Sequence, residues 1–191
     1  MRFLHTSWSD IQRLCEVVAR KIAASGYKPD LVVAISRGGF APARILCDLL
    51  NVDSLASVSI KYYEEIGTRR EKPEVEYPLN ADVDGKRVLI VDDVADTGHS
   101  LLTAKEHVLA LGAKDVKVAT LHYKPWSAFK PDYYGETTEA WIVYVWEVRE
   151  TIKDLAKKFR NEGLNEGEIV ERLTSIGFDE EIVRKTLRGE I

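Results

Sequence analysis

The amino-acid sequence predicts an α/β fold, in which a parallel twisted sheet is flanked by helices and followed by a helical C-terminal extension. Continuous apolar runs at Leu31–Ile35, Arg87–Val91 and Val116–Leu121 are typical of strands that are covered on both faces. Segments with helical spacing separate these runs, and such a β-α-β order favours a parallel sheet.

Length and composition limit the class of protein. A chain of 191 residues with 45% hydrophobic content can form one α/β domain and a small appendage, and we place these at 1–150 and 151–191. It has no apolar run of about 18 residues, and its first residues are too polar for a signal peptide, so we expect a cytoplasmic protein without a membrane partner. The net charge of -4 argues against a nucleic-acid partner.

The helices follow from capping residues and apolar spacing. The first is expected to begin near Ser7 or Ser9 and to end at Gly26, with Trp8 on its apolar face. Others are expected at 40–50 and 99–111, and three short amphipathic helices at about 150–161, 166–176 and 179–188. Residues 55–60 are expected to form a further strand. The two cysteines, Cys15 and Cys47, fall within helical patterns and are interpreted as packed thiols.

The segment 88–100 carries the clearest chemical pattern. A buried strand delivers Asp92 and Asp93 to its C-terminal end, where open α/β sheets bind ligands. These carboxylates suit sugar hydroxyls and a hydrated Mg²⁺, and Asp96 follows where it can exchange a proton with a nucleophile. The turn and the first helical amides then suit a phosphate, with hydroxyls and a glycine at Thr97, Gly98 and Ser100.

This segment resembles the motif that binds phosphoribosyl pyrophosphate (PRPP) in the type I phosphoribosyltransferases, which has four hydrophobic residues, two acidic residues and a phosphate loop containing T-G. The resemblance implies the fold of that family, with a small hood over the site. It also implies Mg²⁺ at Asp92 and Asp93, and Asp96 as the catalytic base. The PRPP-binding residues that it implies are Asp92, Asp93, Ala95, Asp96, Thr97, Gly98, His99 and Ser100.

A second turn, S-R-G-G-F-A-P, follows the first buried strand and exposes amides beside one cation, which suits pyrophosphate. It is similar to the pyrophosphate loop of the same family, in the form found in bacterial xanthine-guanine enzymes. The resemblance implies a cis peptide bond between Arg37 and Gly38. The pyrophosphate-binding residues that it implies are Ser36, Arg37, Gly38 and Lys61.

The base pocket is expected beyond the last buried strand. Lys124 in L-H-Y-K-P, with Trp141 and Ile142 in E-A-W-I, is similar to the pattern of the 6-oxopurine branch, in which a lysine donates to the purine O6 and an aromatic ring stacks on the base. Alternatively, Lys124 is a solvated surface residue and Trp141 a core residue.

The charged segment 62–80 has no apolar period and is long for a connection, so we expect a functional loop. Its position matches the family's hood, with Tyr63 near the place of a Ser-Tyr pair. Arg69 and Arg70, like Lys61, are candidates for neutralising pyrophosphate. Alternatively, this is an ordinary exposed charged loop.

The resemblance implies a Mg²⁺-dependent enzyme that joins guanine, xanthine or hypoxanthine to the ribose of PRPP, and we expect it to be a homo-oligomer. An adenine or orotate phosphoribosyltransferase and a PRPP-binding regulator with little catalysis are the alternatives. The C-terminal G-F-D-E-E-I-V stretch also resembles part of the ubiquitin-associated modules, but its apolar positions favour a packing role.

Overall fold

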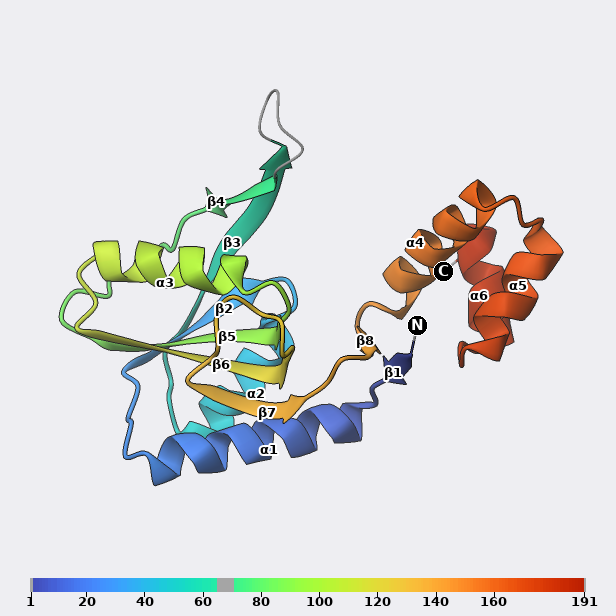
Figure 1. Ribbon diagram of the computed structural model, residues 1–191. Coiled ribbons are helices and arrows are strands. Elements are labelled where there is room, and N and C mark those ends of the chain that lie inside the picture. The colour runs from blue at the N-terminus through green and yellow to red at the C-terminus, as the bar shows by residue number, and fades with distance from the viewer. Residues whose placement is uncertain (1, 65–70, 191) are drawn as a thin grey trace. The chain divides into compact units, whose positions relative to one another are not determined.

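The chain forms two compact units in the computed structural model, which describes residues 2–64 and 71–190 (Figure 1). The sheet unit comprises Ser9–Glu139. The helical unit joins the N-terminal residues through Trp8 to the segment that begins at Ala140.

Within the described residues, the sheet unit is built on six strands in the order β4-β3-β2-β5-β6-β7. All neighbouring pairs are parallel except β3 and β4, so the predicted parallel α/β sheet is confirmed, with an antiparallel strand at one edge. The strands are β2 (Leu31–Ser36), β3 (Leu55–Glu64), β4 (Glu71–Tyr77), β5 (Arg87–Ala95), β6 (Asp115–Tyr123) and β7 (Tyr133–Thr137).

Helices cover both faces of this sheet. Helix α3 (His99–Ala110) lies on one face, and α1 (Trp8–Ala24) and α2 (Phe40–Leu50) lie on the other (Figure 1). Val33 and Ile90 share a buried cluster with Val108 of α3. Because strand side chains alternate, the equally buried Val32 and Leu89 face the opposite helices. Burial on both faces explains why β2, β5 and β6 are continuous apolar runs.

Strand β5 continues beyond the residue at which the apolar run ends. The sequence predicts a strand that ends at Val91, whereas β5 continues to Ala95 and pairs with β6 along this extension. Asp92 and Asp93 therefore belong to the strand itself. Backbone pairing to β6 fixes their positions, which a free turn would not do.

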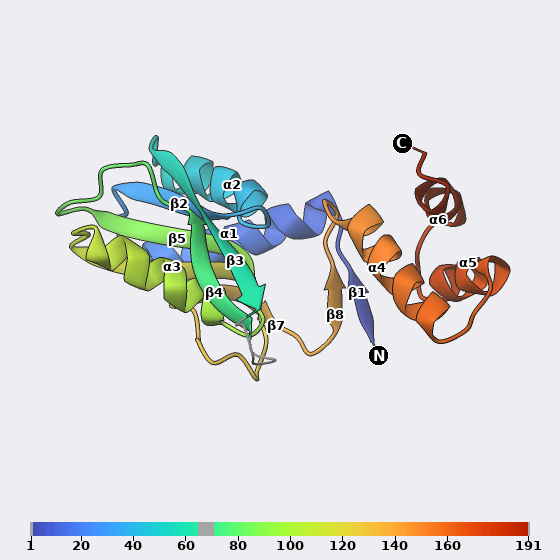
Figure 2. The same cartoon turned by 90° about the horizontal axis from the view of Figure 1, so that it is seen from above.

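The segment expected to be a loop at 62–80 is partly regular. Strand β3 runs on to Glu64 and pairs with β4 in an antiparallel arm that extends from the sheet (Figure 2). One face of this arm carries Lys61, Glu74 and Glu76, whereas Ile60 and Val75 on the other face pack against the buried cluster of the sheet. This alternation is too short to indicate strands in the sequence, and Pro73 is tolerated because β4 is an edge strand. Arg69 and Arg70 lie outside the described residues.

The helical unit pairs two short parallel strands, β1 (Phe3–His5) and β8 (Trp141–Val143), and adds three helices. These are α4 (Val148–Asn161), α5 (Glu166–Ser175) and α6 (Glu180–Leu187), and all three confirm the predicted helices. A capping box formed by Asn165 and Glu168 begins α5. One buried cluster joins β8 to the three helices, through Val143, Ile152, Phe159, Leu173 and Val183.

Trp8 departs from its expected place on the apolar face of α1, because 59% of its surface is exposed. It sits in the first turn of the helix, where its ring lies 6.0 Å from that of Trp146. Both cysteines are buried free thiols, as predicted. None of the helices in the described ranges has both the length and the apolar character needed to cross a membrane.

The cluster of the helical unit predicts the effect of truncating one core side chain. Leu173 is fully buried there, so Leu173→Ala is expected to reduce the unfolding free energy by about 2–5 kcal/mol through lost contacts and a residual cavity. Denaturant unfolding of the full chain measures this. The exposed neighbour Glu171 provides the control, since Glu171→Ala should change the free energy by less than about 0.5 kcal/mol. Equal effects of the two variants would contradict this packing.

Candidate active site

Two adjacent carboxylates lie at the carboxyl end of β5. Asp93 is buried and Asp92 is partly buried, and the Asp93 amide donates to Asp92 Oδ1 at 3.0 Å. Burial raises the pKa of Asp92 well above its ordinary value, and the neighbouring charge of Asp93 raises it further. The two carboxylates therefore carry negative charge at an electrostatic cost, which a cation or a hydroxyl donor would reduce.

The turn after β5 leads directly into α3 and has the geometry of an anion site. Gly98 has a positive φ of 83°, and a Cβ there would lie 2.6 Å from the Phe129 amide nitrogen, so only glycine fits. Gly98 is the N-cap of α3 and has no side chain to accept from the first amides of the helix, and the His99 amide makes only a long contact of 3.5 Å with Thr97 Oγ1. A hollow of about 380 Å³ forms here, and its lining includes Asp92, Asp93, Asp96, Thr97, Gly98 and Ser100.

The remaining predicted residues of this segment lie outside the lining of the hollow. Ala95 is buried, and its carbonyl accepts a hydrogen bond from the Lys124 amide at 3.0 Å. His99 is the first residue of α3 and is exposed. Ala95 thus links the end of β5 to Lys124 through its backbone.

Tyr62 reaches this hollow from the β3 arm, which the sequence reasoning did not foresee. Its hydroxyl accepts a hydrogen bond from Ser100 Oγ at 3.0 Å and lies 3.2 Å from Thr97 Oγ1. Both hydroxyls belong to the predicted phosphate turn, so Tyr62 occupies donors that a phosphate would use. The residue predicted from the sequence is the neighbouring Tyr63, whose side chain lies outside the described part of the chain.

The second predicted turn joins β2 to α2 and borders the first. The expectation of a cis bond between Arg37 and Gly38 is wrong by one residue, because the cis bond joins Ser36 and Arg37. Glycine is required at positions 38 and 39 because the backbone of the turn closely approaches β5. A Cβ at Gly38 would collide with the Asp93 carboxylate, and one at Gly39 would collide with the Val91 carbonyl. The backbone of this turn therefore lies against the carboxylate strand.

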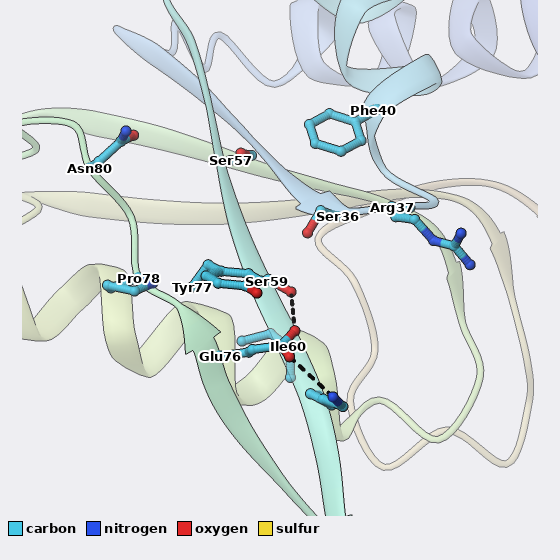
Figure 3. A pocket seen from close by; sticks show the side chains of 11 residues that line it. Ser36, Arg37, Phe40, Ser57, Ser59, Ile60, Glu76, Tyr77, Pro78 and Asn80 are labelled. Carbon is cyan, nitrogen blue, oxygen red and sulfur yellow. Dashed lines mark hydrogen bonds and ion pairs between the residues drawn. The ribbon is translucent and has the colours of Figure 1, made fainter.

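A larger hollow, of about 860 Å³, lies along β3 beside this turn (Figure 3). Ser36, Arg37 and Lys61 line it, so three of the four predicted pyrophosphate residues share one cavity. Glu76 also lines it and pairs with Lys61 at 3.1 Å. Gly38 does not line this hollow and lies against Asp93 instead. The turn therefore lies between the carboxylate pair and the predicted pyrophosphate site.

Lys124 follows β6 and is only 5% exposed, so the solvated alternative is wrong. Burial lowers the pKa of its ammonium, whereas the Asp96 carboxylate acts in the opposite direction. The Lys124 Nζ lies 5.4 Å from the centre of the Trp126 ring, and the Trp126 indole N–H donates to Asp96 Oδ1 at 3.0 Å. Lys124 and Asp96 are thus brought together, and Trp126 is a second residue that the sequence reasoning missed.

Trp141 and Ile142 belong to β8 of the helical unit. Trp141 is 48% exposed, which excludes the alternative of a core residue, whereas Ile142 is buried. Their contact with a base stays a prediction.

Metal binding by the protein alone is limited. Within the described residues, no group of three or more His, Cys, Asp or Glu side chains is placed to hold an ion. Mg²⁺ commonly binds through one or two carboxylates together with substrate phosphates. The Asp92–Asp93 pair fits that mode, because a cation there would offset the burial and the neighbouring charge that raise the pKa of Asp92.

A parallel sheet with a phosphate-type turn and paired carboxylates at its carboxyl edge is the arrangement of α/β proteins that bind phosphorylated ligands. Residues 7–155 match the model of the phosphoribosyl transferase domain family. The chain therefore belongs to the phosphoribosyl transferase domain family.

Named relatives support this membership. A xanthine-guanine phosphoribosyltransferase of Ruegeria sp. (strain TM1040) is 34% identical over 156 residues, covering 75% of this chain and 85% of that protein. A hypoxanthine-guanine phosphoribosyltransferase of Schizosaccharomyces pombe is 29% identical over 186 residues, covering 77% and 90%. The crystal structure of a purine phosphoribosyltransferase from Pyrococcus horikoshii matches with 40% identity and a TM-score of 0.68, covering 76% and 94%.

The crowded carboxylates predict a gain in stability when one charge is removed. Because the folded-state pKa of Asp92 is raised, its ionisation costs stability. That cost is absent below the ordinary carboxylate pKa, grows as the pH rises towards the raised value, and is complete above it. We expect Asp92→Asn to raise the Tm of the ligand-free protein at pH 7.5 by about 2 °C or more, and to weaken PRPP binding. Thermal melts and titration calorimetry measure the two effects. A gain that stays the same as the pH is lowered would contradict the electrostatic cause.

The contacts of Tyr62 predict competition with phosphate. Tyr62→Phe frees the hydroxyls of Thr97 and Ser100, so it is expected to tighten PRPP binding about threefold or more. Calorimetric titration with PRPP and Mg²⁺ provides the measurement. Tyr134→Phe, on β7 at the opposite edge of the sheet, is the matched control and should leave the affinity unchanged. Weaker binding by Tyr62→Phe would mean that this hydroxyl helps to hold the ligand.

Proposed function

We propose that this member of the family is a purine salvage phosphoribosyltransferase, which joins a 6-oxopurine base to the ribose of PRPP and releases pyrophosphate. The observation that carries the proposal is the hollow at the end of β5, where three carboxylates meet two hydroxyls and the first turn of α3. The xanthine-guanine and hypoxanthine-guanine enzymes among the relatives support the choice of base.

Each side chain has a proposed task in binding PRPP. Thr97, Ser100 and the α3 amides hold the 5′-phosphate, and Asp92 and Asp93 accept hydrogen bonds from the ribose hydroxyls. The turn of Ser36, Arg37 and Gly38, together with Lys61, receives the pyrophosphate. Mg²⁺ held by Asp92 and Asp93 together with PRPP oxygens would supply positive charge against the leaving group.

The reaction breaks the bond between C1′ and the pyrophosphate oxygen and forms a bond between C1′ and N9 of the base. Positive charge on the ribose ring in the transition state is favoured by the carboxylates beneath it. Asp96 accepts the proton that the base loses, which is the task of a general base. Lys124 donates to the exocyclic O6, and Trp141 and Ile142 are proposed to contact the ring.

The base preference rests on Lys124. An ammonium donates to a carbonyl oxygen but finds no acceptor in the amino group of adenine, so the buried Lys124 favours an oxopurine over adenine. A regulator without catalysis is the other alternative. It has no need of Asp96 beside the phosphate turn, and the net charge of -4 speaks against a nucleic-acid partner.

The proposed enzyme is a homo-oligomer, and the segment 151–191 is proposed to have a packing role. The buried cluster that α4, α5 and α6 share with β8 supports a role for the segment in stability. Size-exclusion chromatography with light scattering tests the oligomeric state.

A pyrophosphate-release assay tests the function, with PRPP, Mg²⁺ and guanine, xanthine, hypoxanthine, adenine or orotate. We expect turnover with at least one 6-oxopurine, and expect Asp96→Asn to lower kcat about a hundredfold with PRPP affinity nearly unchanged. Asp82→Asn serves as the control, because Asp82 is exposed in the turn before β5. Turnover of adenine or orotate, but of no 6-oxopurine, would instead indicate an adenine or orotate phosphoribosyltransferase. The absence of pyrophosphate release from PRPP with any of the five bases would refute the proposal.

A further inference from the structure

Trp126 links the proposed proton acceptor to the proposed base-binding lysine. Its indole N–H donates to Asp96 Oδ1 at 3.0 Å, and its ring lies 5.4 Å from Lys124 Nζ. All three residues belong to the sheet unit, where Asp96 follows β5 and Lys124 follows the neighbouring β6. One side chain therefore contacts two groups that the two strands deliver separately.

The loop that carries Trp126 is fixed to the phosphate turn. The Ala128 amide donates to the Thr97 carbonyl at 3.0 Å, and the Ser127 amide donates to the Lys124 carbonyl at 3.0 Å. Trp126 is nevertheless 56% exposed, so burial alone does not account for a large aromatic side chain at this position. The hydrogen bond to Asp96 and the contact with Lys124 explain a tryptophan at this position better than packing does.

We propose that Trp126 is a positioning residue, which orients the carboxylate of Asp96 and holds the Lys124 ammonium beside it. The inference rests on the proposed function, because it assigns a task to Trp126 within that same site. The indole is a donor only, so it engages one carboxylate oxygen and leaves the other to the substrate. The ring face attracts the ammonium through a cation–π interaction.

These two contacts can be separated by substitution. Trp126→Phe removes the N–H donor and keeps an aromatic ring for Lys124, whereas Trp126→Leu removes both. In the full chain with PRPP, Mg²⁺ and guanine, we expect Trp126→Phe to lower kcat about tenfold, which is the effect of one hydrogen bond to a charged group. The KM for guanine should stay within about twofold in Trp126→Phe and should rise clearly in Trp126→Leu.

The split between kcat and KM provides a readout that a merely structural role would not change. Because the N–H bond orients the Asp96 carboxylate, its loss should lower kcat in Trp126→Phe while the KM for guanine stays nearly constant, whereas Trp126→Leu should also raise KM. The matched control is Trp8→Phe, since Trp8 is exposed to a similar extent in the helical unit and has no proposed task. This control should keep the wild-type kcat and KM.

A double-mutant cycle with Asp96→Asn completes the test. If Trp126 acts through Asp96, adding Trp126→Phe to Asp96→Asn should cause little further loss of kcat. A full additional loss in that background, including loss through misfolding, would overturn the inference. The inference would also be overturned if the wild type were active and Trp126→Phe had the same kcat and KM as Trp8→Phe. A wild type inactive on every base would refute the proposed function itself, and this inference with it.

Discussion

The close approach of the glycine turn after β2 to the carboxylate end of β5 is the constraint on which the site depends. Gly38 lies against the Asp93 carboxylate, and Gly39 lies against the Val91 carbonyl, with no room for a side chain at either position. Strands β2 and β5 are hydrogen-bonded neighbours, so their turns necessarily emerge side by side at one edge of the sheet. The buried apolar runs fix this pairing, and polar groups with little intrinsic tendency to associate are thereby held together.

The same geometry imposes an electrostatic cost. Asp92 and Asp93 are adjacent in the strand and poorly hydrated, which raises the pKa of Asp92. Nearby, burial lowers the pKa of Lys124. Each shift disfavours the charged form in the ligand-free protein. A ligand that carries both a cation and hydrogen-bonding groups compensates such charges, so perturbed groups of both signs in one region are typical of a binding site rather than of a structural core.

Much of the fold and of the site could be predicted from local patterns. The apolar runs identified β2, β5 and β6, and the acidic pair with its turn identified the residues around the hollow, because all of these signals lie within short segments. The β3–β4 arm was missed because the charges of Lys61, Glu74 and Glu76 interrupt its apolar residues, so the alternation is too short to stand out. Tyr62 and Trp126 were missed for another reason, since their partners lie far away in sequence and only the folded chain brings them within hydrogen-bonding distance.

The helical unit contains both the end of the region that matches the family and the residues that follow it. The family match ends at residue 155, inside α4, so α5 and α6 lie beyond it. Yet the buried cluster that contains Val143 and Ile152 is completed by Leu173 and Val183 from those two helices. Without α5 and α6, much of the apolar surface of α4 and β8 would be exposed to water, at a cost proportional to its area. The two terminal helices therefore stabilise the strand that carries Trp141, which gives them a physical reason to be present even if they never touch a substrate.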